Sequence, residues 1–357
     1  MAAEARRDFS LSRVLSWQAL IALGISIALL VFLATSFDPD FAGVRERLGN
    51  SNVALLGLAF LAHYASLVVR GYRWRHMLVA SKEPGKGEIP SGPTCSVYLL
   101  LCWFVNAISW LRLGNVYRAY LVSKRTGGSF FWAMGTVVSE RFMDLVAVLL
   151  MLTVAGVLLL SSDDSGRVWP FLATAAGVTL ALGVIFMMMR RNGASILRLL
   201  PRRLHEGYER FATAALATLR RDDLPILGAM TLAGWGLEAA RLWLVVLALH
   251  LDISFQMLVF VTFAQGLLIS APLTPGGLGV VEPGLTGVLL FAFDRPEAVS
   301  ITLLDRAISY VSVIVLGAAV FGVREAWAYL TPNPLSLRGE GAREPDILTG
   351  ERRRDAV

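Results

Sequence analysis

The chain has 357 residues, of which 55% are hydrophobic and 17% are charged, and its mean hydropathy is +0.61. This composition is too apolar for a water-soluble domain of that length, so it excludes the soluble classes and predicts an all-α integral membrane protein. The formal net charge of +6 comes from basic residues spread over connecting segments, with no aromatic-interleaved basic platform, so we expect no nucleic-acid partner.

Six long apolar runs are each close to or above the roughly 18 residues that a helix needs to cross a bilayer core. In chain order they are residues 17–33, 53–69, 130–160, 169–189, 224–249 and 298–323. The first run is followed by no small-residue cleavage site, so we expect a retained helix and not a signal peptide. Two further runs, 95–111 and 255–293, are broken by polar residues or by prolines and glycines.

The distribution of lysine and arginine assigns sides to the connections, because these residues accumulate in short cytoplasmic loops. Residues 1–16, 70–94, 112–129, 190–223 and 324–357 hold 26 of them, whereas residues 35–52, 161–168, 250–254 and 294–297 hold 4. This distribution of basic residues fits a single topology only if each broken run returns to the membrane face from which it enters. We therefore predict two re-entrant helical hairpins, about 91–111 from the cytoplasm and about 255–293 from outside. Six full transmembrane helices then leave both termini cytoplasmic, in the inner (plasma) membrane.

The domain organisation follows from these assignments. A cytoplasmic N-terminal segment, 1–16, precedes a single transmembrane domain that spans 17–330. Apolar and basic residues at helical spacing predict a cytoplasmic amphipathic helix over about 194–221, either on the membrane surface or bound to a partner. The tail, 331–357, is rich in proline, glycine and charge and is expected to be disordered.

An internal repeat relates the two halves of the predicted domain. A shift of 165 residues places Leu113 and Gly114 on Leu278 and Gly279, and it also places the Glu140-Arg141 pair on the Asp305-Arg306 pair. The repeat units, about 53–160 and 224–323, have opposite predicted orientations. Inverted repeats whose interrupted helices meet near the membrane centre are typical of transporters.

The stretch APLTPGGLGVVEP, residues 271–283, is dense in helix breakers. A kinked helix would need one proline, whereas non-helical backbone within a bilayer is tolerated only beside protein or a water-filled cavity. A protein-lined cavity is therefore expected here, with turn amides that can bind an anion. The breakers are Pro272, Pro275, Gly276, Gly277 and Gly279.

Charged residues inside the apolar runs are the candidate substrate-binding groups, because such residues usually face a cavity or each other. They are Glu140, Arg141, Asp144, Glu282, Asp305 and Arg306, with Glu238 and Arg241 as supporting residues. The alternative is that they form ion pairs that lock helices together. Arg112 and Arg118 follow the first hairpin and either cradle a phosphate or set the topology.

Enzyme signatures are missing from the sequence. The four histidines show no metal-ligand spacing, and no phosphate-binding glycine loop or serine elbow occurs, so we expect no metal, no cofactor and no catalysis. Cys95 and Cys102 are about two helical turns apart in one apolar run, which favours packing over a disulfide.

Four stretches together resemble a known family. LGNVYRAYLVSKRTG (113–127), VVSERFMDLVAVLL (137–150), LTPGGLGVVE (273–282) and LLDRAISY (303–310) are similar to the flippase-like transmembrane domain of lysylphosphatidylglycerol synthases. The resemblance covers about residues 16–327. It implies two re-entrant regions and translocation of polar-headgroup lipids between leaflets, and it marks as matching Arg118, Glu140, Arg141, Asp144, Pro275, Gly276, Gly277, Gly279, Glu282, Asp305 and Arg306.

Two departures from the family pattern limit what it implies. No aminoacyltransferase domain follows within the sequence, so we do not expect aminoacylation of a lipid. Many relatives carry Pro-Gly and then an acid in the first hairpin, where this chain has Trp110, Leu111 and Asn115. The first hairpin is therefore not expected to bind the same group in the same way.

The leading functional hypothesis is a lipid flippase or transporter whose substrate is a phospholipid, glycolipid or other membrane lipid. The alternatives are a membrane-embedded transferase acting on a lipid headgroup and a non-catalytic accessory subunit. We expect the protein either to form a homo-oligomer or to bind a lipid-synthesising enzyme.

Overall fold

The computed structural model describes residues 41–81, 83, 87–109, 112–159, 201, 205–270 and 274–330, with scattered positions between 169 and 191. Within this part of the chain every regular element is a helix, which confirms the predicted all-helical class. Three of the described helices are long and apolar enough to cross a membrane, and they begin at Val53, Leu224 and Arg295. The predicted helices 17–33 and 169–189, the segment 1–16 and the tail 331–357 lie wholly or mostly outside the described residues.

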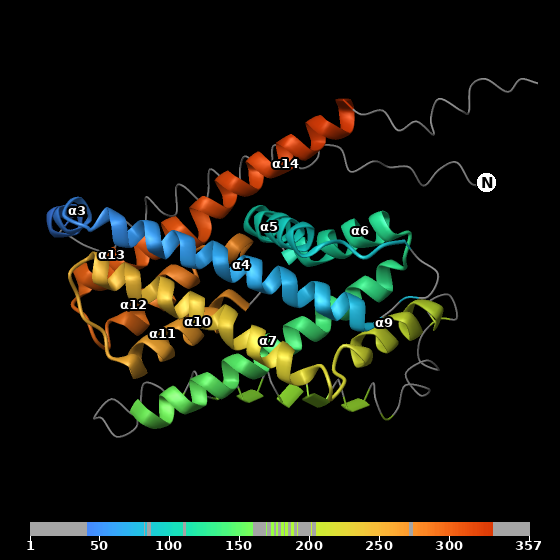
Figure 1. Ribbon diagram of the computed structural model, residues 1–357. Helices are drawn as coiled ribbons and strands as arrows, with labels where there is room; N and C mark the ends of the chain where they lie inside the picture. Colours follow the sequence, from blue (N-terminus) through green and yellow to red (C-terminus); the bar gives the residue numbers. More distant parts are fainter. Residues whose placement is uncertain are drawn as a thin grey trace, which may run out of the picture.

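Two long helices, α4 (Val53–Ser81) and α10 (Leu224–Ala248), lie against each other along the middle of the molecule (Figure 1). They are antiparallel, because the backbone N–H of Asn52, just before α4, donates to the carbonyl of Ala248 at 2.8 Å. The prediction that the first of them ends near residue 69 is wrong. The helix continues to Ser81. Arg70 and Arg73, which were counted with a basic cytoplasmic loop, are instead buried inside the fold.

The first broken run forms a pair of packed helices, α5 (Gly92–Ile108) and α6 (Gly114–Thr126). Ser91 caps the N-terminus of α5, because its side chain accepts a hydrogen bond from the backbone N–H of Thr94. The two helices approach closely at Gly114, where a Cβ would lie 2.0 Å from the carbonyl oxygen of Cys102. Both cysteines are free and buried, as predicted.

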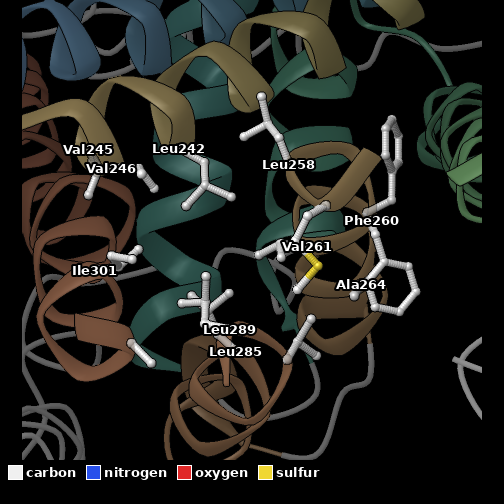
Figure 2. Close-up of a cluster of buried hydrophobic side chains, with 14 of the residues drawn as sticks. Leu242, Val245, Val246, Leu258, Phe260, Val261, Ala264, Leu285, Leu289 and Ile301 are labelled. Carbon is white, nitrogen blue, oxygen red and sulfur yellow. The ribbon is translucent and has the colours of Figure 1, made fainter. Parts of the chain in front are cut away.

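The second broken run forms the corresponding pair, α11 (Phe255–Ser270) and α12 (Val281–Leu289), joined by a turn that includes the short helix η3 (Pro275–Gly277). Apolar side chains of α10, α11, α12 and α13 (Arg295–Arg306) pack into one core beside it. Figure 2 shows Leu242, Val246, Val261, Leu285 and Ile301 converging there. This core fixes the position of the second pair against the long helices.

A long helix follows each pair. After α6 comes α7 (Phe130–Leu159), and after α12 comes α13, which continues through a π-helical turn, η4 (Ala307–Val311), into α14 (Ser312–Leu330). The order of long helix, helix pair and long helix therefore occurs twice. Two smaller helices, α3 (Phe41–Gly49) and α9 (His205–Ala217), flank this core.

The two helix pairs open toward opposite ends of the molecule. At one end, the connection after α4 touches the end of α6, since Gly87 N–H donates to the carbonyl of Thr126 at 2.8 Å. At the other end, α3 reaches the start of α13 through an ion pair of 3.3 Å between Arg47 and Glu297. Figure 1 shows α5 and α6 toward the right-hand end of α4, and α11 and α12 toward its left-hand end.

Helix α9 ends at Ala217, four residues before the end of the predicted amphipathic helix 194–221. Residues 192–200 and 202–204 lie outside the described part. Its small residues pack on α7, where the hydroxyl of Ser139 donates to the carbonyl of Ala215 at 2.8 Å. One face of α9 is thus covered by protein rather than by lipid.

Candidate functional site

A cavity of about 500 Å³ lies where the tips of the two helix pairs meet. The hydroxyl of Tyr310 donates to the carbonyl of Ala107, at the tip of α5, at 3.1 Å. From the same tip, Nη1 of Arg112 donates to the carbonyl of Ser270, at the end of α11, at 3.0 Å. The volume lies within the range of ~300–1,000 Å³ that is usual for small-molecule sites.

Guanidinium groups from several segments face this cavity. They belong to Arg70 on α4, Arg112 between α5 and α6, Arg141 on α7, Arg241 on α10 and Arg306 on α13. Aromatic rings lie beneath two of them, since the guanidinium carbon of Arg70 is 4.8 Å from the ring centroid of Trp235 and that of Arg306 is 4.6 Å from Tyr310. The cavity wall thus combines cationic groups with apolar surface.

The first ion-pair network surrounds Arg73, whose side chain is 0% exposed. Its guanidinium lies 2.7 Å from a carboxylate oxygen of Asp144 and 3.1 Å from one of Glu140, and it also donates to the hydroxyl of Thr231. Behind Glu140, Arg118 lies 2.7 Å from the other carboxylate oxygen. This network joins α4, α6, α7 and α10.

Arg141 occupies a different position from its neighbour Glu140. Consecutive residues of a helix do not share a face. Both side chains line the cavity, but the Glu140 carboxylate pairs with Arg73 and Arg118, whereas the Arg141 guanidinium is farther from any carboxylate. The nearest carboxylate oxygen of Asp144 is 3.9 Å from Arg141, and Nη2 of Arg141 donates to the Asn115 side chain at 3.3 Å. The side chain of Arg141 is 33% exposed, which keeps it accessible from the cavity.

The second network is built on Arg241. Its guanidinium lies 3.4 Å from Glu238 on its own helix and 3.1 Å from Asp305 on α13. Glu238 in turn contacts Nδ1 of His63 at 3.3 Å and accepts a short hydrogen bond from Ser66. The network therefore ties α4, α10 and α13 together on the opposite wall of the cavity.

The glycine-rich turn differs from the expected anion-binding loop. The N–H groups of residues 277, 278 and 280 donate to carbonyls within the turn, and the N–H of Gly279 donates to the Glu282 carboxylate at 2.7 Å. Arg306 completes the arrangement, with Nε 2.8 Å from Glu282 and Nη2 donating to the carbonyl of Gly276 at 3.0 Å. In this structure the turn amides therefore bind the protein's own groups.

The predicted site residues fall into two groups. Those that line the cavity are Glu140, Arg141, Asp144, Gly276, Gly277 and Arg306, with the supporting residues Arg112, Glu238 and Arg241. Those that pack outside the lining are Arg118, Pro275, Gly279, Glu282 and Asp305. Pro272 lies outside the described residues. The structure thus places Arg118 behind Glu140, away from any group bound in the cavity.

The profile of a family described as the lysylphosphatidylglycerol synthase TM region matches residues 19–317. The chain belongs to this family. The match covers every residue that lines the cavity. The resemblance seen in the sequence is therefore confirmed at the level of the family.

Relatives of this member of the lysylphosphatidylglycerol synthase TM family include UPF0104 membrane proteins and a glycosyltransferase. A UPF0104 membrane protein of Methanocaldococcus jannaschii is 32% identical over 228 residues, which are 62% of this chain and 94% of that protein. A UPF0104 membrane protein of Methanothermobacter thermautotrophicus is 24% identical and matches 83% of this chain and 91% of its own length. The glycosyltransferase AglD of Haloferax volcanii is also 24% identical, over 83% of this chain but only 53% of AglD.

Several cavity and network residues of this family member were not predicted from the sequence. They are His63, Arg70, Arg73, Trp103, Asn115, Trp235 and Gln265. A usable signal existed for two of them, because Arg70 and Arg73 are three residues apart and face Glu140 and Asp144, which are four residues apart on α7. No comparable spacing in the sequence marks the amide residues Asn115 and Gln265 or the aromatic residues Trp103 and Trp235.

Proposed function

We propose that this protein moves lipids with polar headgroups between the two leaflets of the membrane, with the headgroup in the cavity and the acyl tails in the bilayer. The observation that carries the proposal is the set of five arginines around one cavity between interrupted helices. Ionised side chains at membrane depth are rare and usually face a substrate pathway. Interrupted helices that meet at such a site are a recurrent feature of transporters.

We propose the following topology for this function. The domain 17–330 has six crossings and two re-entrant hairpins, and the units 53–160 and 224–323 form an inverted repeat with both termini in the cytoplasm of a plasma-membrane protein. The repeated helix order and the opposite openings of the two helix pairs support this arrangement.

Cysteine labelling tests the topology at two matched aspartates. Asp222 and Asp252 are both exposed, one in the turn before α10 and the other in the connection after it. In a background without Cys95 and Cys102, we expect a membrane-impermeant maleimide to label Asp252→Cys on intact cells. Asp222→Cys should react only after the membrane is permeabilised. Equal labelling of the two positions on intact cells would contradict the proposed sides.

Transport itself is tested with the purified protein in liposomes that contain fluorescent lipids in both leaflets. Exchange between leaflets should be faster than in empty liposomes, and Asp305→Asn and Arg306→Ala should each slow it by about tenfold or more, as expected when a charged hydrogen-bonding partner is lost from a buried site. Arg220→Ala, at an exposed position, is the control and should transport normally. The proposal is wrong if anionic, zwitterionic and glycosylated lipids all exchange no faster than without protein.

A membrane-embedded transferase is the second candidate, favoured by the glycosyltransferase name of one relative and by the His63–Glu238 pair on the cavity wall. A carboxylate that orients an imidazole is a common arrangement for a general base. Incubation with activated sugar donors followed by lipid extraction separates the two candidates, because only a transferase yields a new lipid. Copurification with a lipid synthase, combined with inactivity alone, would instead support an accessory role.

A further inference from the structure

The ionised side chains around the cavity do not balance. Among the described residues, seven arginines and five carboxylates line the cavity or pair directly with groups that do, which leaves two positive charges uncompensated when His63 is counted as neutral. The arginines are Arg70, Arg73, Arg112, Arg118, Arg141, Arg241 and Arg306, and the carboxylates are Glu140, Asp144, Glu238, Glu282 and Asp305. A guanidinium does not lose its proton in a protein, so this excess cannot be removed by titration of the arginines.

The excess lies on one wall of the cavity. Arg241 and Arg306 on α10 and α13 are paired with three carboxylates, so that wall holds one more carboxylate than arginine. The wall formed by α4, α6, α7 and the turn before α6 holds the other five arginines, against Glu140 and Asp144 among the described carboxylates. The unbalanced charge is therefore concentrated beside α7 and the tip of the first helix pair.

Two arginines on that wall are the least compensated. Arg112 forms no ion pair with a carboxylate among the described residues and is fixed instead by the carbonyl of Ser270. Arg141 lies 3.9 Å from Asp144, a carboxylate that Arg73 approaches to 2.7 Å. Its Nε is buried with no hydrogen-bond partner among the described residues. Both guanidiniums thus retain capacity to bind an anion.

The backbone of Arg112 supports a functional role for this residue. Its φ of 54° is in the left-handed region, which side-chain-bearing residues adopt at an energetic cost and which often marks a ligand site. The strain places a guanidinium at the tip of the first helix pair, on the cavity. Asn115 follows on α6, lines the same cavity and accepts from Arg141.

We propose that the cavity selects lipids whose headgroup carries at least two negative charges on phosphate, either as a phosphate monoester or as a pyrophosphate. The phosphate lies between Arg112 and Arg141, with Asn115 beside it. This inference rests on the proposed function only in treating the cavity as the headgroup site. A dianion neutralises the two excess charges, whereas a phosphodiester neutralises one, a zwitterion none, and a cationic headgroup adds to the imbalance.

Native mass spectrometry of the full chain tests the selection, with phosphatidic acid as the phosphate-monoester probe at about pH 8, above the second ionisation of a phosphate monoester. Phosphatidylglycerol, phosphatidylcholine and lysylphosphatidylglycerol provide headgroups of lower charge, and inorganic phosphate tests whether the lipid is needed. Phosphatidic acid should bind about tenfold or more tightly than phosphatidylglycerol, since one further charge-assisted contact is worth at least that factor. Farnesyl pyrophosphate, which carries at least two negative charges at this pH, should bind at least as tightly as phosphatidic acid.

Three variants locate the selection in the cavity. Arg112→Gln and Arg141→Gln should each lower the preference for phosphatidic acid by about tenfold, because each removes one of the two least compensated cations. Asn115→Asp should do the same with almost no change in shape, since its carboxylate would compete for Arg141. Arg220→Gln, which is exposed, should leave the preference unchanged.

The outcomes separate this inference from the proposed function. Equal affinity for the four lipids, or a phosphatidic acid preference that survives all three variants, would overturn the inference even if the protein transports lipids. Binding of inorganic phosphate as tight as that of phosphatidic acid would overturn the assignment to a lipid. Selective binding of phosphatidic acid without leaflet exchange would support the inference and count against transport.

Discussion

Replacing Arg73 by methionine is expected to lower the free energy of unfolding by about 3–5 kcal/mol, which is the usual effect of removing one partner from a buried ion pair. Arg73 is 0% exposed and lies between Glu140 and Asp144, both also buried. Its loss leaves Asp144 with only the more distant Arg70 and Arg141, at 3.5 and 3.9 Å. Thermal denaturation in detergent would measure the change.

Two further variants separate charge from packing in this prediction. Arg75→Met makes the same substitution at an exposed position of the same helix and should leave the melting temperature nearly unchanged. Adding Asp144→Asn to Arg73→Met removes the stranded carboxylate and should restore part of the lost stability. If Arg73→Met melts at the same temperature as Arg75→Met, the network around Arg73 does not hold these helices together.

Replacing Gly276 by alanine should reduce lipid transport to near the rate of empty liposomes. Gly276 has φ of 60°, where an L-residue is strained, and its new Cβ would lie 2.1 Å from the ring of Tyr310. Overpacking of this kind costs about 1–3 kcal/mol, and the left-handed backbone adds about 1–2 kcal/mol. Movement of Tyr310 would also break its hydrogen bond to Ala107 and the stacking on Arg306, so both tips would shift.

Gly287→Ala is the matched control for this variant. Gly287 lies on α12 with nothing within 4 Å of its Cβ position, so alanine fits there and also favours the helix. Leaflet exchange in liposomes should be normal for Gly287→Ala and close to background for Gly276→Ala. Normal exchange by Gly276→Ala would show that the shape of the turn is not needed for transport.

The sequence predicted most of what depends on local chemistry. The breaks in both apolar runs were found because proline, glycine and polar residues interrupt helices in ways that need no knowledge of the fold. The arginines Arg141 and Arg306, matched by the 165-residue shift, do face one cavity. The family assignment and the all-helical class are confirmed, whereas the re-entrant geometry, the sidedness and the lipid substrate stay predictions.

Pairing between distant residues could not be predicted, because it depends on how the helices pack. The sequence left open whether the charged residues inside the apolar runs bind substrate or form ion pairs between helices, and it did not identify the partners, which are Arg73 for Glu140 and Arg241 for Asp305. Glu282, a candidate substrate-binding residue in the sequence, pairs with Arg306 of the same half of the chain. Arg73 was misassigned to a loop because the hydropathy of an arginine is the same whether its side chain is buried in a helix or exposed in a loop.

The contact between the two hairpin tips has an energetic consequence for movement. One hydrogen bond, from Arg112 to Ser270, and a small apolar cluster that includes Leu278 hold the tips together, and a second hydrogen bond ties Ala107 at the first tip to Tyr310 on η4. Each hydrogen bond contributes about 1 kcal/mol net, so the tips are held by only a few kcal/mol. A free-energy difference of a few kcal/mol means that the tips are apart in about 0.1–10% of the molecules at any moment. Thermal motion alone is therefore sufficient to part the tips in a small fraction of the molecules, which is the opening that the proposed lipid transport requires.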